Sequence, residues 1–191
     1  MKTFVVENNI KGKLPEFWYH LPDSVITNPG KPFYIPEFAP HIEAHLTLVL
    51  KVNRLGKSIA QRFAERYFSE VAVGVHFRAS ELRKQLIDKG LPADKSWAFD
   101  RSLILSDFYP KDTFLTDSPI SLLKNGVIEK EILPDFSNDA IGAVFQAVSN
   151  ANTLKIGDLL LPYLSEGIKV DINDVIELKK ANKTLLRIEI K

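Results

Sequence analysis

The stretch "APHIEAHLTLVLKV", residues 39–52, alternates apolar and polar side chains with the period of two that is typical of a β-strand. His41, Glu43 and His45 fall on one face of this predicted strand, because successive side chains point to opposite faces. Two imidazoles and one carboxylate on one face of an apolar strand suggest metal ligands. The alternative is the polar remnant of such a site, and His41 by itself fits a solvent-facing histidine at a loop edge.

The composition indicates one globular domain that extends over residues 1–191. The net charge of only +1 argues against a nucleic-acid partner, because a phosphate backbone is held by a broad basic field. The sequence shows neither a secretory signal nor an apolar run long enough to span a bilayer, so we expect a cytoplasmic protein without membrane contact. The lack of cysteine excludes disulfides, thiolate metal ligands and a cysteine nucleophile.

Strand signals outnumber helix signals along the chain. Alternating or continuous apolar runs predict strands within residues 70–77 and 158–164, and hairpins at residues 120–132 and 174–191. The first hairpin has Asn125-Gly126 at its turn, the favoured pair for a tight two-residue connection. Helices are expected at residues 57–68, 80–89 and 139–148, the last one after a cap at Asn138. This pattern predicts an α+β fold that is mainly β and mainly antiparallel, with a few peripheral helices.

The apolar positions of the two strongest strand signals define the predicted core. Residues of one face should pack inward while their neighbours face the other way. The residues expected to be buried are Ile42, Leu46, Leu48, Leu50, Val71, Val73 and Val75.

Seven segments, in order and at plausible spacing, resemble the motifs of the fumarylacetoacetate hydrolase family. They are "FWYHLPDSVI" (17–26), "IEAHLTLVLKVNRLGKSI" (42–59), "VAVGVHFRASELRKQ" (71–85), "KSWAFDRSLIL" (95–105), "KNGVIEKE" (124–131), "TLKIGDLLL" (153–161) and "INDVIELKKANKTLLRIEI" (172–190). The resemblance implies a single domain with a mixed β-sandwich roll and a shortened N-terminal segment. It also implies a homodimer and an activity on 2-oxo acids as a hydrolase, decarboxylase, hydratase or isomerase.

Proteins of this family hold a divalent metal with carboxylates. By the resemblance, Glu43 takes the place of the first glutamate of their E-x-E motif, whereas His45 replaces the second glutamate. His76 replaces the aspartate of the neighbouring strand. Two histidines and one carboxylate suit Zn²⁺, Fe²⁺ or Mn²⁺ better than Mg²⁺. Lys95 matches a lysine of the family site and is the candidate catalytic residue, with a surface lysine as the alternative.

Other polar positions of the family site are replaced in this chain. Ser80 stands where the family has an arginine, Leu21 where it has a lysine, and residues 162–165 where it has a threonine loop. The family's N-terminal histidine segment has no counterpart. The losses favour a protein with weakened or lost catalysis that binds a small carboxylate or associates with an active relative.

Two other hypotheses stay open, so the sequence does not decide whether the chain is an enzyme. One is an active metal-dependent hydrolase, isomerase or decarboxylase that acts on a 2-oxo acid or diketone through Glu43, His45 and His76. The other is a structural interaction domain that uses the family's dimer surface. Trp18 and Trp97 could line a pocket, although buried core is the commoner fate of tryptophan.

Overall fold

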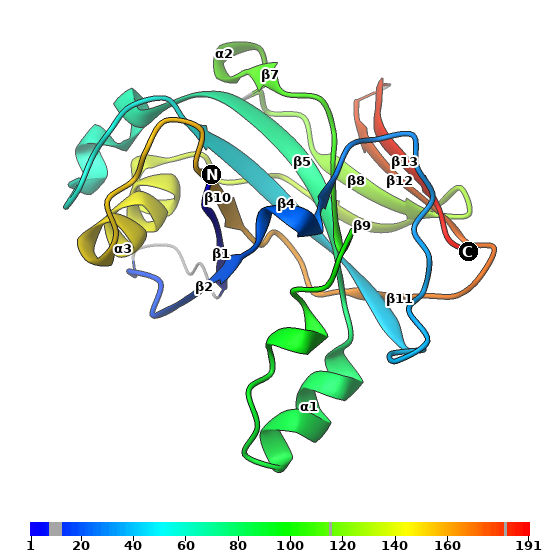
Figure 1. Cartoon of the computed structure of the whole chain (residues 1–191). Helices are drawn as coiled ribbons and strands as arrows, with labels where there is room; N and C mark the ends of the chain where they lie inside the picture. Colours follow the sequence, from blue (N-terminus) through cyan, green and yellow to red (C-terminus); the bar gives the residue numbers. More distant parts are fainter. Residues whose placement is uncertain (8–12, 115, 182) are drawn as a thin grey trace.

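Two long antiparallel strands, β4 (Ile42–Val52) and β5 (Phe68–Arg78), run through the middle of the molecule (Figure 1). The structure is a computed structural model that describes residues 1–7, 13–114, 116–181 and 183–191. In both strands every second side chain is apolar over most of the length, so these side chains share one face of the strand. That face can be buried in the core. Their pairing places the candidate site residues, as described below.

The larger sheet has nine strands, and its main order is β2-β1-β10-β4-β5-β6-β3. Two further strands, β11 and β7, pair with β4 and β5 respectively. Strands β1 and β10 are parallel, as are β3 and β6, and the other pairs are antiparallel. The bounds are β1 (Thr3–Glu7), β2 (Phe17–Leu21), β3 (Ile26–Thr27), β6 (Leu103–Leu105), β7 (Tyr109–Pro110), β10 (Leu159–Pro162) and β11 (Ile168–Val170).

The second sheet has four antiparallel strands in the order β13-β12-β8-β9. They are β8 (Ile120–Lys124), β9 (Val127–Ile132), β12 (Val175–Lys180) and β13 (Lys183–Glu189). Asn125 and Gly126 join β8 to β9 with φ angles of 52° and 80°, the positive values that a tight hairpin of this kind requires. Both predicted hairpins are confirmed.

The main core lies on one face of β4 and β5, and the apolar residues predicted to be buried all belong to it. Each has at most 1% of its surface exposed: Ile42, Leu46, Leu48, Leu50, Val71, Val73 and Val75. The opposite face carries a smaller cluster that includes Val49, Ala72, Trp97 and Leu161. This second face is where the polar residues of the candidate site are found.

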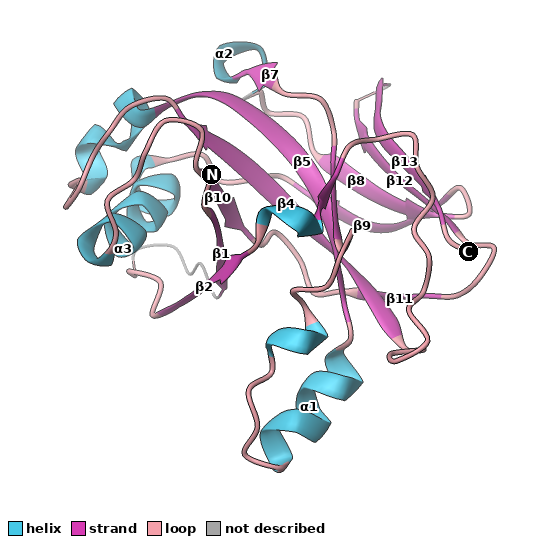
Figure 2. Ribbon diagram, viewed as in Figure 1, coloured by secondary structure: helices cyan, strands magenta, loops and turns pink. Residues whose placement is uncertain are grey.

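The helices lie around the sheets, and Figure 2 shows α1 and α3 at the edges of the molecule. They are α1 (Ser80–Asp88), α2 (Lys111–Phe114), α3 (Ala143–Ala151), η1 (Asp23–Val25), η2 (Gln61–Tyr67), η3 (Asp94–Ser96) and η4 (Asn138–Gly142). The α+β, mainly β prediction is confirmed. Within the described parts of the chain, no helix is both long and apolar enough to cross a membrane.

Two of the predicted helices differ from the observed ones. The segment predicted as a helix over residues 57–68 is a 3₁₀ helix that begins only at Gln61, because Ser58 has a φ of 51° and Ala60 is extended. The helix predicted at residues 139–148 opens with a π-helical turn and continues to Ala151. The helix predicted at residues 80–89 matches α1 to within one residue.

Candidate functional site

The pairing of β4 with β5 places two of the predicted site residues side by side. His45 lies directly opposite His76, and Glu43 lies directly opposite Arg78. Residues that are opposed in an antiparallel pair have side chains on the same face and in contact range. His41 precedes β4, and its side chain is 74% exposed, so it faces solvent and does not lie beside His45.

Both ring nitrogens of His76 are engaged by the protein, and the side chain is fully buried. Nε2 lies 2.8 Å from the backbone carbonyl oxygen of Trp97, which can only accept a hydrogen bond, so Nε2 carries the proton. Nδ1 therefore accepts from the hydroxyl of Tyr163, at 2.6 Å. The Tyr163 oxygen in turn accepts from the hydroxyl of Tyr19, at 3.1 Å. The Trp97 carbonyl oxygen cannot donate, and this fixes the donor and the acceptor of each hydrogen bond in the chain.

The aromatic ring of Tyr163 packs against both His45 and Arg78. It stacks on the His45 ring, with 5.4 Å between centroids and 19° between planes. The Arg78 guanidinium lies 5.2 Å from the Tyr163 centroid and 5.9 Å from the Trp97 ring. Tyr163 follows β10, and the pairing of β10 with β4, which continues in a bridge between Tyr163 and Thr47, brings it to this site from a remote part of the sequence. The polar cluster so formed consists of Glu7, Tyr19, Glu43, His45, His76, Arg78 and Tyr163.

His45 is enclosed by the segment that connects β10 to β11. Its Nε2 atom is buried and has no hydrogen-bond partner among the described residues, although a Glu43 carboxylate oxygen lies 3.5 Å away. The backbone of Gly167 closes over the ring, because a Cβ atom at this position would lie 2.4 Å from Nε2. Only glycine fits there without a shift of the ring.

Arg78 contributes the buried positive charge of the cluster. One of its terminal nitrogens lies 2.8 Å from a carboxylate oxygen of Glu7 on β1, and 8% of the residue is exposed. Glu43, which faces Arg78 across the strands, is engaged instead by the Ser80 hydroxyl, which donates to it at 2.5 Å. The cluster thus holds one cation, two acids and two neutral histidines.

Burial determines how these groups titrate. Desolvation lowers the pKa of His76 to about 3, and the nearby Arg78 charge adds to this effect. Desolvation and Arg78 also lower the pKa of His45 to about 4, against an opposing effect of Glu43. Desolvation raises the pKa of Tyr19 to about 12 and raises that of Tyr163 as well. Both imidazoles and both phenols are neutral at neutral pH.

The lowered histidine pKa values predict that the protein loses stability in mild acid. An unfolded histidine has a pKa near 6.5, so below about pH 6.5 the unfolded state takes up protons that the folded state does not. The stabilisation is complete above that pH and is lost towards about pH 4 for His45 and about pH 3 for His76. We expect His45→Gln or His76→Gln to reduce the slope of unfolding free energy against pH by roughly 1.4 kcal/mol per pH unit.

Urea denaturation between pH 4.5 and pH 7.5 measures this slope. The control is His41→Gln, because that imidazole is largely exposed and should leave the slope unchanged. An unchanged slope in both His45→Gln and His76→Gln would show that these histidines are protonated in the folded state.

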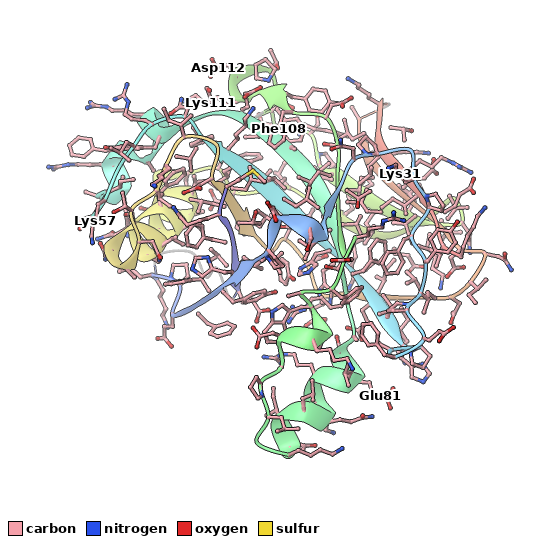
Figure 3. The ribbon with its side chains drawn as sticks, in the orientation of Figure 1. Lys31, Lys57, Glu81, Phe108, Lys111 and Asp112 are labelled. Carbon is pink, nitrogen blue, oxygen red and sulfur yellow. The ribbon has the colours of Figure 1, made fainter. Side chains whose placement is uncertain are left out.

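A pocket of about 430 Å³ opens beside Glu43, between the start of β4, the first turns of α1 and β11. Three acids lie on its wall, and Glu43 accepts a hydrogen bond from Ser80. Glu81 lies 3.6 Å from His41 and Asp171 lies 3.9 Å from Lys124, and both of these acids have exposed side chains. Figure 3 labels Glu81 on α1.

The lysines of this pocket differ from its acids. Lys84 on α1 and Lys169 on β11 both line the pocket and are exposed. Within the described residues, neither of them forms an ion pair. Lys84 and Lys169 are therefore the cationic side chains that the pocket can offer to an anion.

Among the other residues singled out from the sequence, Lys95 and Trp18 lie outside the cluster, and Trp97 contributes its backbone carbonyl to it. Lys95 is exposed on η3, with its ammonium group 4.9 Å from the Phe38 ring, and has no contact with the two histidines. Trp97 is buried, as expected for core, and its carbonyl holds His76. Trp18 is partly buried against the main core.

Sequence reasoning missed Arg78, Tyr19 and Glu7, and it included Tyr163 only as part of the replaced loop at residues 162–165. Arg78 could have been found, because it lies two residues after His76 and so shares its face of β5. Tyr163 lies within residues 162–165, which the resemblance places at the family site, but its contacts with the histidines depend on the pairing of β10 and of Tyr163 itself with β4.

No protein-family model matches the chain, and no curated protein matches it either. Solved structures do match. Fumarylpyruvate hydrolase from Pseudomonas aeruginosa, in complex with Mn²⁺ and pyruvate, has a TM-score of 0.86 at 18% identity and aligns over 100% of this chain and 89% of its own. A fumarylacetoacetate hydrolase family protein from Yersinia pestis CO92 has a TM-score of 0.84 at 22% identity, over 100% and 92%.

A third match is 5-carboxymethyl-2-hydroxymuconate delta-isomerase from Mycobacterium smegmatis, with a TM-score of 0.83 at 18% identity, over 99% of this chain and 78% of its own. These likenesses show that the chain has the fold of the fumarylacetoacetate hydrolase family, as its motifs predict.

The residues present do not fit the divalent metal that this fold family implies. Within the described residues, no group of three or more histidine, aspartate or glutamate side chains is placed to hold a metal ion. His76 has no free nitrogen, and the Gly167 backbone covers His45. The buried guanidinium of Arg78 would also repel a dication.

Proposed function

We propose that the chain binds a small carboxylate in the pocket beside Glu43 and does not carry out metal-dependent chemistry on it. The observation that supports this is the pair Lys84 and Lys169, which line the pocket from two elements and form no ion pair with the described residues, while the partly buried acid Glu43 is held by Ser80. A pocket of about 430 Å³ is also of the size that holds small organic ligands.

The two lysines come from different elements, α1 and β11, so a ligand between them would bridge the helix and the strand. Carboxylates accept hydrogen bonds from ammonium groups, and such charge-assisted bonds are stronger than neutral ones. Because both side chains are exposed, each contact adds a modest amount of affinity. We therefore expect weak binding that decreases with salt.

The closed cluster explains why we propose binding without turnover. A bound metal would polarise a 2-oxo acid and stabilise the anion that forms on it. In this chain the buried positive charge of the cluster belongs to Arg78, which is paired with Glu7 and lies against the Tyr163 and Trp97 rings. The cluster is thus closed around its own charges, and only Glu43 among its residues lines the pocket. No specific observation favours the active two-histidine enzyme.

Removal of both pocket lysines should abolish most of the binding. In isothermal titration with pyruvate and with succinate, in the presence of EDTA, we expect Lys84→Ala/Lys169→Ala to raise Kd at least about tenfold, since two charge-assisted contacts of about 1 kcal/mol each are lost. The control is Lys31→Ala/Lys89→Ala, which removes the same charge from exposed positions outside this pocket. Equal binding by both double variants would contradict the proposal, as would binding that requires Mn²⁺.

A second copy of the chain is a proposed partner as well. Strand β9 is the edge of the four-stranded sheet, and Val127 and Ile128 on it are 64% and 57% exposed. A free strand edge with apolar side chains is a surface that pairing with another copy would cover.

A further inference from the structure

A basic surface lies at the other end of β4, away from the pocket. Residues 51–67 contain five basic residues and one acidic residue, whereas the whole chain has a net charge of +1. This segment leads from the end of β4 through η2 into β5. The positive charge of the protein is thus concentrated locally.

Five cations define this surface, which we call the basic patch: Arg54, Lys57, Arg62, Arg66 and Lys155. All five are exposed, and Figure 3 shows Lys57 at the margin of the molecule. Counting only the residues that the structure describes, none of the five forms an ion pair. The patch offers charges that the fold itself does not use.

Aromatic rings hold the arginines of the basic patch in place. The guanidinium groups of Arg62 and Arg66 lie 4.8 and 4.9 Å from the Phe63 centroid, and that of Arg54 lies 6.0 Å from the Tyr67 centroid. Contacts of this kind reduce the freedom of the long side chains. A planar guanidinium in a fixed place matches a carboxylate with two parallel hydrogen bonds.

Two exposed aliphatic side chains accompany these cations. Leu55 is 63% exposed and Ile156 is 74% exposed. Their loops are joined by a pair of backbone hydrogen bonds between Gly56 and Leu154, of 3.1 and 2.8 Å. The same loop lies against η2, because a Cβ atom on Gly56 would be 2.5 Å from the Tyr67 ring. Leu55, Ile156 and the basic patch therefore belong to adjacent segments of the chain.

We propose that this surface docks an acidic segment of another protein, one that carries aliphatic side chains among its carboxylates. Arginine and apolar anchors together are typical of protein–protein contacts. A long nucleic acid or an anionic bilayer extends beyond the basic patch. The rest of the chain would repel it, because setting the five patch cations aside from the net charge of +1 leaves a net charge of −4. A short acidic segment meets the basic patch alone.

Fluorescence anisotropy with a short fluorescein-labelled peptide of alternating glutamate and leucine tests the proposal on the full chain. We expect Arg62→Glu/Arg66→Glu to weaken binding at least about tenfold. The control Lys31→Glu/Lys89→Glu makes the same change of net charge at exposed positions elsewhere and should have less than about a twofold effect. Arg62→Gln/Arg66→Gln, which avoids new negative charges, should give an intermediate loss.

The contribution of Leu55 and Ile156 is tested with a double variant and a matched control. Leu55→Ser/Ile156→Ser should weaken binding several-fold, whereas Ile87→Ser/Ile172→Ser, at positions 50% and 63% exposed, should not. Equal losses in the two charge-reversal variants would overturn the proposal. So would tighter binding to oligouridylate or to phosphatidylserine vesicles than to the peptide, or self-association of the chain that Arg62→Glu/Arg66→Glu abolishes.

Discussion

Replacing His76 with aspartate should destabilise the folded protein by about 3 kcal/mol, the cost expected when a buried site loses its hydrogen-bonded partner and gains an unsatisfied charge. His76 is fully buried, donates to the Trp97 carbonyl and accepts from Tyr163. An ionised aspartate cannot donate to that carbonyl, and the Arg78 charge can compensate only part of its desolvation. Urea denaturation at pH 7 measures the loss.

The same variant separates a structural histidine from a vestigial metal ligand. The resemblance expects aspartate at this position and glutamate at position 45, so a vestigial metal site should regain its ion in His76→Asp or in His45→Glu/His76→Asp, and Mn²⁺ should then restore stability by mass action. We expect no such recovery, since Tyr163 and Arg78 remain in place. His41→Asp, on an exposed side chain, should cost less than about 0.5 kcal/mol. Recovery of the His76→Asp stability by Mn²⁺ would contradict the account of the cluster.

Replacing Phe77 with alanine should cost about 4 kcal/mol, the largest effect that we expect from a single core residue. Phe77 has no exposed surface and stacks on Phe33, with 3.8 Å between centroids and 12° between planes. Phe33 also bonds through its backbone to Glu189, at the end of β13. The pair therefore ties β5 to the second sheet, and its loss leaves a cavity between them.

Urea denaturation again measures this effect, with Phe38→Ala as the matched control. Phe38 is 42% exposed and meets Phe99 edge to face at 5.7 Å, so its removal should cost about 1 kcal/mol or less. A cost for Phe77→Ala as small as that of the control would show that the two sheets are not joined there.

Local patterns in the sequence predicted much of the fold. Alternation placed β4 and β5 and identified their buried face, and Asn125-Gly126 marked the hairpin between β8 and β9. The 57–68 helix was placed too early because its apolar stripe continued over residues that are not helical, where Ser58 adopts a positive φ.

The candidate site was less accessible to sequence reasoning, because contacts between distant residues complete it. The motifs placed Glu43, His45 and His76 on neighbouring strands, and the register confirms that the two histidines meet. The motifs did not indicate that Tyr163 stacks on His45 and bonds to His76, or that Glu7 pairs with Arg78 from the first strand. Such contacts depend on the tertiary structure, and no periodicity records them.

The most direct test of the central claim, a metal-free cluster beside a carboxylate-binding pocket, is isothermal titration of Mn²⁺ into protein purified with EDTA. The account predicts no stoichiometric binding at micromolar concentrations, and the same isotherm for His45→Gln and for the native chain, because neither His76 nor the covered His45 offers a free ligand. Binding of one Mn²⁺ per chain that His45→Gln and His76→Gln both abolish would contradict it.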